Sequence, residues 1–154
     1  MNAASIPNAP GELKLTPTLQ EVVKTAFERG RPISVAYTDA QGHPQLSFRG
    51  SLQPYSDTAL AIWVRNPESG ILKAVRAGHE HIAALYGDPS GQRAFLTFRG
   101  RGRIDDSEAV RRRVYDSAPA GERDRDREQK GVPLIIELDS VEGLFQGEFL
   151  RMRR

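Results

Sequence analysis

Cysteine is absent from this sequence of 154 residues, which excludes disulfides, thiolate nucleophiles and cysteine metal ligands. Long apolar runs are also missing, since none approaches the roughly 18 residues that a membrane-spanning helix needs. Residues 1–15 lack the charged-then-apolar order of a signal peptide. Because a chain without disulfides suits a reducing compartment, we expect a cytoplasmic protein that has no membrane partner.

An excess of charge of one sign is lacking too. The 22 basic residues are nearly balanced by 20 acidic ones, so the formal net charge of +2 implies no general attraction to nucleic acid. One local basic run exists, in which Arg99, Arg101 and Arg103 alternate with glycines. It could be an RNA-binding segment, but it lacks the interleaved aromatic residues on which single-stranded bases stack. We therefore expect a solvated strand face and no nucleic-acid partner.

Familiar catalytic and metal-binding motifs are not present. The sequence contains no Walker loop, no G-x-G-x-x-G after a strand, no G-x-S-x-G and no H-E-x-x-H. His79 and His81 are separated by one residue, and in an extended segment they would need further ligands from elsewhere. We expect no metal site and assign no catalytic residue. An enzyme with this sequence would borrow its chemistry from an organic cofactor.

The periodicity predicts one domain of mainly β structure, residues 16–154, preceded by a flexible arm, residues 1–15. We expect strands over residues 33–38, 44–50, 60–65, 81–86, 93–104, 133–138 and 143–150. We expect helices over residues 16–30, from residue 69 and over residues 107–115, whereas residues 116–130 are interpreted as a solvated helix or loop and residues 151–154 as a basic tail. Short turns between strands indicate an antiparallel sheet of about seven strands, with roughly two to four short helices, closed or nearly closed into a barrel.

Residues 45–77 hold a candidate phosphate cradle. In the strand over residues 60–65, Leu60, Ile62 and Val64 alternate with residues that end in Arg65 on the opposite face. Ser69 and Gly70 then begin a helix whose backbone N–H groups and dipole favour an anion. Arg49, Arg65, Ser69, Gly70 and Lys73 are the candidate phosphate ligands. Taken singly, these charges could also be ordinary surface residues, and Ser69 an ordinary N-cap.

Two segments resemble the pyridoxamine 5′-phosphate oxidase-like, FMN-binding split β-barrel proteins. SFRGS at residues 47–51 is similar to the family's flavin-contacting strand, and WVRNPES at residues 63–69 to its aromatic-x-x-N-x-x-S segment. The closing segment GVPLIIELDSVEGL is also similar. Where the oxidase itself carries Arg-Lys after the serine, this chain has Gly70-Ile71, and it ends soon after Leu150.

The resemblance implies a split antiparallel β-barrel that binds FMN, or alternatively the deazaflavin F420. It implies a homodimer with the cofactor at the subunit interface and an oxidoreductase that transfers hydride through flavin N5 to or from a small-molecule substrate, but not a true pyridoxamine phosphate oxidase. Non-enzymatic flavin or haem binding is the alternative, with His79 and His81 as the haem candidates. Trp63 would contact the ring or the partner subunit, or else pack in the core. The implied cofactor-binding residues are Ser47, Phe48, Arg49, Gly50, Ser51, Trp63, Val64, Arg65, Ser69, Gly70 and Lys73.

Overall fold

The computed structural model describes residues 9–154, and residues 1–8 of the expected arm lie outside the described part. In chain order the elements are β1 (Gly11–Glu12), α1 (Pro17–Thr25), β2 (Ser34–Thr38), β3 (Pro44–Phe48), β4 (Gln53–Pro54), β5 (Ala59–Val64), α2 (Gly70–Arg76), β6 (His81–Asp88), β7 (Ala94–Ile104), α3 (Glu108–Ser117), α4 (Ala120–Arg123), the 3-10 turn η1 (Asp124–Asp126), β8 (Val132–Phe145) and β9 (Glu148–Arg153). The expected split β-barrel with peripheral helices is confirmed.

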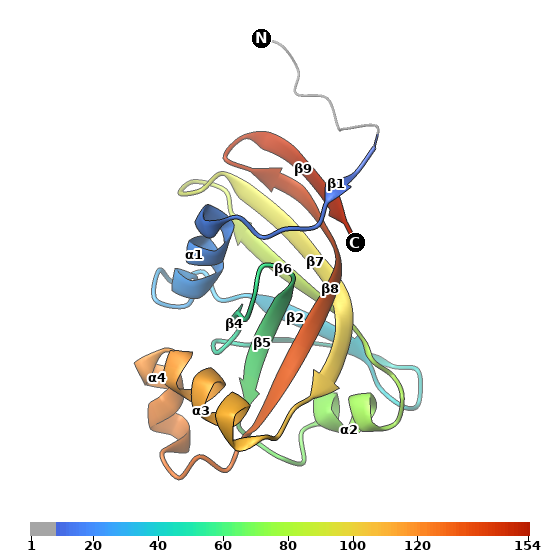
Figure 1. Ribbon diagram of the computed structural model, residues 1–154, viewed down its shortest axis with the longest axis vertical. Coiled ribbons are helices and arrows are strands. Elements are labelled where there is room, and N and C mark those ends of the chain that lie inside the picture. Colours follow the sequence, from blue (N-terminus) through green and yellow to red (C-terminus); the bar gives the residue numbers. More distant parts are fainter. Residues whose placement is uncertain (1–8) are drawn as a thin grey trace.

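The strands form one nine-stranded sheet in the order β1-β9-β8-β7-β6-β2-β3, with β5 paired to β8 outside this path. The first half of β8 lies between β5 and β7, whereas its second half lies between β9 and β7. This branching bends the sheet into a barrel that does not close (Figure 1). A bulge between Arg99 and Gly100 helps β7 to bend.

Local signals account for several element ends. The hydroxyl of Thr16 accepts a hydrogen bond from Leu19 N at 3.2 Å, so it caps α1, and Pro17 occupies the first turn. Gly30, with φ +72°, adopts the left-handed conformation expected after this helix. Asp39 binds the backbone N–H groups of Gln41 and His43 and thereby shapes the predicted turn between β2 and β3.

The C-terminal hairpin and the arm differ from the sequence prediction. The predicted strand over residues 143–150 is wrong, because residues 146–147 form a turn between β8 and β9. Residues 151–153 are not a tail, since they belong to β9. In the arm, β1 pairs in parallel with β9, and Leu13 and Leu15 are buried in the core. The part of the arm from Gly11 onward therefore belongs to the fold.

The core fills the barrel. Residues directly opposite one another across the strands share a face, and Val35, Ala84, Phe98, Val141 and Met152 form one such inward row. Each fully buried aliphatic side chain contributes about 1.5–3 kcal/mol to stability. A second, smaller cluster lies on the other side of β5, where α3 covers Ala61 and Trp63. Both faces of β5 are therefore buried.

The outer face of the sheet carries apolar side chains that this chain leaves uncovered. Leu46 and Phe48 on β3 are 74% and 70% exposed, so the apolar face of this strand points away from the core. Their cross-strand neighbours place further exposed apolar residues on the same face. This outer apolar face, as we name it, comprises Leu46, Phe48, Leu85, Phe95 and Phe149.

Across residues 9–154, no helix is both long enough and apolar enough to cross a membrane.

Candidate functional site

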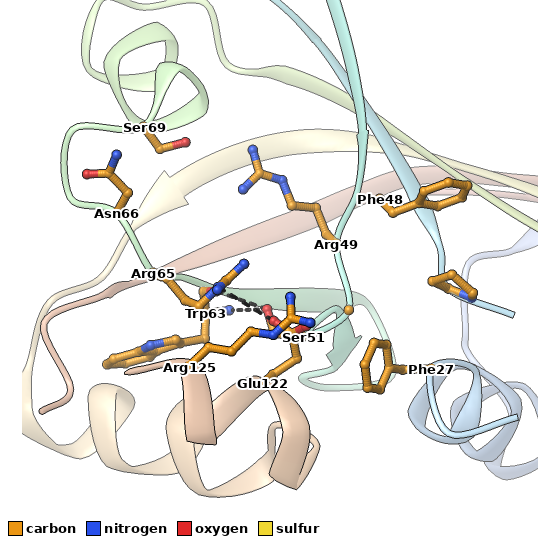
Figure 2. Close-up of a pocket in the computed structure, with 12 residues that line it drawn as sticks. Phe27, Phe48, Arg49, Ser51, Trp63, Arg65, Asn66, Ser69, Glu122 and Arg125 are labelled. Carbon is orange, nitrogen blue, oxygen red and sulfur yellow. Dashed lines mark hydrogen bonds and ion pairs between the residues drawn. The ribbon is translucent and has the colours of Figure 1, made fainter. Parts of the chain in front are cut away.

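A cavity of about 540 Å³ opens where several elements end together. The C-terminal end of β5 reaches the end of the barrel where α2, α3 and α4 lie (Figure 1). Figure 2 shows residues from the segment after β3, from the end of β5, from the start of α2 and from α4 to η1 around one space. The lining residues are Phe27, Pro32, Phe48, Arg49, Gly50, Ser51, Trp63, Arg65, Asn66, Ser69, Glu122 and Arg125.

Arg49 is the most unusual residue of this cavity. Its side chain is half-buried, and its buried Nε has no hydrogen-bond partner among residues 9–154. Burial is the main cause that lowers the pKa of Arg49, and the like charge of Arg65 lowers it further, against the opposite effects of Tyr37 and Glu122. Buried polar groups in proteins are nearly always satisfied. A guanidinium left in this state points to an anion as its missing partner.

Arg65 faces Glu122 across the lower side of the cavity. The distance from Arg65 Nε to Glu122 Oε2 is 3.8 Å, which is an ion pair but longer than a hydrogen bond (Figure 2). The side chain of Arg65 is 43% exposed, whereas that of Glu122 is only 9% exposed. Arg125 also lines the cavity. Three arginines and one carboxylate therefore leave the cavity with an excess of positive charge.

Asn66 and Ser69 form the other end of the site. The side chain of Asn66 accepts a hydrogen bond from Glu68 N at 2.9 Å, which shapes the turn before α2. Ser69 is the N-cap of α2, as predicted, but within the described structure its hydroxyl makes no capping hydrogen bond. Since Ser69 lines the cavity, its hydroxyl is available to a ligand.

Ser51 has a structural role. Its hydroxyl accepts a hydrogen bond from Trp63 N at 3.1 Å and donates one to Trp63 O at 2.9 Å. Ser51 is 2% exposed, so these bonds are shielded from water. They fix the segment that follows Arg49 onto β5 and hold Arg49 near Arg65.

The indole of Trp63 is engaged on the helical side of β5. It packs edge-on against Tyr115, with the ring centroids 5.1 Å apart, and its Nε1 donates a hydrogen bond to Asp126 Oδ2 at 2.8 Å. Arg111 lies over the same ring, 5.2 Å from its centroid. With an exposure of 2%, Trp63 has the surroundings of a core residue, although part of it lines the cavity.

The structure brings together seven of the predicted site residues around the cavity: Phe48, Arg49, Gly50, Ser51, Trp63, Arg65 and Ser69. The other four lie elsewhere. Ser47 is exposed on β3, and Val64 packs in the barrel core. Gly70 packs against the hydroxyl of Tyr37, and Lys73 points to solvent with its side chain 63% exposed, 3.9 Å from Glu68.

Five lining residues were not predicted: Phe27, Pro32, Asn66, Glu122 and Arg125. Asn66 was within the quoted segment and could have been chosen as a turn residue beside the strand end. Glu122 and Arg125 come from residues 116–130, which the sequence indicated as solvated. The small residues at Ala118, Ala120 and Gly121 were the available signal that the chain turns back there.

The sequence raised two other candidate sites, the basic run and the histidine pair. Arg101 pairs with Asp139 at 3.1 Å, and Arg103 pairs with Glu137 at 3.1 Å. These two arginines of the basic run are thus neutralised by carboxylates on β8. His79 and His81 are exposed, and within residues 9–154 no group of three or more histidine and acidic side chains could hold a metal ion.

No protein-family model matches the sequence, and no curated protein matches it either. Solved structures do match. HupZ from Group A Streptococcus aligns with a TM-score of 0.62 and 18% identity, covering 87% of this chain and 97% of HupZ. A Clostridium acetobutylicum protein of the pyridoxinephosphate oxidase family, related to general stress protein 26, aligns at 0.61 and 9% identity, covering 87% and 95% of the two chains. An F420 reductase aligns at 0.55 and 16% identity, covering 77% and 94%. The chain therefore has the pyridoxamine 5′-phosphate oxidase-like fold.

Proposed function

We propose that this protein binds FMN in the cavity between β3, β5, α2 and α4 and acts as a flavin-dependent oxidoreductase on a small molecule. The observation that carries the proposal is the buried Nε of Arg49, which lacks a partner among the described residues and faces a cavity of excess positive charge. A phosphate supplies the missing acceptor and two charges. The segments that resemble FMN-binding split barrels, residues 47–51 and 63–69, supply most of the cavity wall.

The cavity suits a ligand of this kind. Its volume of about 540 Å³ is typical of small-molecule sites, which span roughly 300–1,000 Å³. Arg49, Arg65 and Ser69 would hold the phosphate, and Phe27 and Phe48 would border the ring. Lys73 is not among the ligands that we propose, because it points to solvent beside Glu68.

In the proposed function, the residues of the chain bind and orient the flavin and provide a polar environment for it. The flavin, when bound, accepts or donates hydride at N5. Arg49 and Arg65 neutralise the phosphate, while Ser51 keeps the backbone after Arg49 against β5. The deazaflavin F420 is the second candidate, because it also carries a phosphate and one of the similar structures is an F420 reductase.

We further propose that two copies of the chain associate through the outer apolar face. Monomers rarely leave large apolar side chains grouped on one sheet face. Phe48 belongs both to this face and to the cavity wall. A second copy that covers Phe48 therefore lies beside the cavity and closes it to water, in a two-fold dimer with two equivalent sites.

The test is a comparison of FMN with riboflavin, which has the same ring without the phosphate. We expect the fluorescence of FMN to be quenched when it binds to the protein. We also expect FMN to bind about tenfold to a hundredfold more tightly than riboflavin, since a charge-assisted contact contributes about 1.5–3 kcal/mol. F420 is titrated in parallel. A protein that binds neither FMN nor F420 would refute the proposal, and tighter binding of F420 would assign the site to the deazaflavin.

A further inference from the structure

Glu122 is a buried carboxylate that the fold places inside a cationic cavity. It lies on α4, and the residue is only 7% exposed. Its carboxylate and the ring of Phe27 both pack against Gly50, where a Cβ atom would lie 2.6 Å from Glu122 Oε1 and 2.7 Å from Phe27. The absence of a side chain at residue 50 thus admits Glu122 to the cavity. Figure 2 shows Glu122 and Phe27 away from the end formed by Asn66 and Ser69.

The hydrogen-bonding capacity of Glu122 is not used by the protein. An ionised carboxylate has two acceptor oxygens, and a buried one normally accepts several hydrogen bonds. Within residues 9–154 the only charged group paired with it is Arg65, at 3.8 Å, and neither oxygen accepts a hydrogen bond from a described residue. If Glu122 served simply to neutralise arginine, we would expect the short contacts of about 2.7–2.9 Å that charge-assisted pairs adopt.

We propose that Glu122 accepts a hydrogen bond from an N–H group on the ring of the bound ligand and so determines which ligands the site accepts. This inference rests on the proposed function, because it assumes that the phosphate lies at the end of the cavity formed by Asn66 and Ser69, with Arg65 between it and Glu122. The ligand class is a phosphorylated heterocycle whose ring carries an imide N–H, a group that flavin and deazaflavin share. Rings that present only acceptors at this edge meet a buried negative charge and are rejected.

The experiment compares FMN with N3-methyl-FMN, in which the imide hydrogen is replaced by a methyl group. Both are titrated against the full-length protein and three variants. Glu122→Gln keeps the size of the side chain but removes its charge, and Glu122→Ala removes the acceptor. Asp124→Ala is the matched control, because Asp124 is a neighbouring acid whose side chain is 64% exposed and lies outside the cavity lining.

We expect the unmodified protein and Asp124→Ala to prefer FMN over N3-methyl-FMN by about tenfold or more, which corresponds to one charge-assisted hydrogen bond. The preference falls severalfold in Glu122→Gln and disappears in Glu122→Ala. Steric exclusion of the methyl group alone predicts an unchanged preference in Glu122→Gln, which would overturn the inference. Equal tightening of both ligands in Glu122→Ala would also overturn it and leave Glu122 as a counter-ion. Absence of FMN binding to the unmodified protein would overturn the proposed function as well.

Discussion

The indole N–H of Trp63 and the carboxylate of Asp126 meet at 2.8 Å and tie the last turn before β8 to strand β5. The same carboxylate accepts hydrogen bonds from the backbone N–H groups of Lys130 at 3.0 Å and Gly131 at 2.8 Å. Asp126 therefore fixes the segment that carries Arg125 and Glu122 into the cavity. Its loss affects both the stability of the fold and the shape of the site.

The stability that Asp126 contributes depends on pH. Burial alone would raise its pKa, but the hydrogen bonds from Trp63, Lys130 and Gly131 outweigh burial, so the pKa lies below the ordinary value of 3.8. A depressed pKa stabilises the folded state above pH 3.8, and this contribution is lost as the pH falls through the folded-state value. We expect Asp126→Asn to lower the free energy of unfolding by about 1–3 kcal/mol at pH 7, and by less at pH 3.

Urea unfolding at both pH values measures this difference. Asp124→Asn is the control, since that acid is exposed, and it should change stability little at either pH. A loss in Asp126→Asn that is the same at pH 7 and at pH 3 would contradict a role for the charge of Asp126.

Replacing Arg49 should separate phosphate binding from ring binding. We expect Arg49→Ala to weaken FMN binding by about one to two decades and to leave riboflavin binding nearly unchanged, because only FMN offers the anion that the buried Nε lacks. Fluorescence titration with both ligands measures the effect. Arg127→Ala, whose side chain is 79% exposed and outside the cavity lining, provides the control. Equal losses for both ligands would mean that Arg49 supports the ring pocket or the fold.

The bulge of β7 at Gly100 requires a residue without a side chain. A Cβ atom at this residue would collide with the carbonyl oxygen of Glu137 on β8. We expect Gly100→Ala to lower the free energy of unfolding by about 1–3 kcal/mol, as overpacking does. Gly87→Ala on β6 is the matched control, since its Cβ would meet Phe95 at an ordinary 3.8 Å. Chemical denaturation compares the two, and similar stability of both variants would refute the role of the bulge.

If the chain forms the proposed dimer, placing charged residues on the outer apolar face should shift the protein from dimer to monomer. Phe48 and Leu46 are exposed by 70% and 74% in the single chain. A double replacement by aspartate should raise the dimer dissociation constant by about tenfold or more, because centrally buried apolar residues dominate association. Sedimentation equilibrium gives the constant, with Arg127→Asp as a control. A parent protein that sediments as a monomer at all concentrations would exclude the dimer.

Much of the fold followed from signals that are local in the sequence. The cap at Thr16, the turn shaped by Asp39 and the bulge at Gly100 each depend on residues a few positions apart or on glycine itself. Which face of β3 turns toward the core could not be predicted in this way. Alternation distinguishes the two faces of a strand, but the pairing of Ser47 with the buried Val35 decides which face is inside.

The sequence predicted the part of the candidate site that the strands supply, but not the part that α4 and η1 supply. Arg49 and Arg65 could be found because each follows a recognisable strand. Glu122 and Arg125 could not, because their segment is rich in charge and its burial results from the return of α4 across the end of β5. A carboxylate that is buried by tertiary contacts has the same sequence signature as one in solvent.

The position of β3 at the edge of the sheet has a consequence for how the purified protein behaves. This strand hydrogen-bonds to β2 alone among the described strands, so its other edge presents free backbone groups beside Leu46 and Phe48. Such an edge can template the addition of strands from other molecules, and only Pro44 withholds a donor from it. A net charge of +2 supplies little repulsion between molecules. We therefore expect the solubility of the protein at high concentration to depend on whether the hairpin of β2 and β3 is covered.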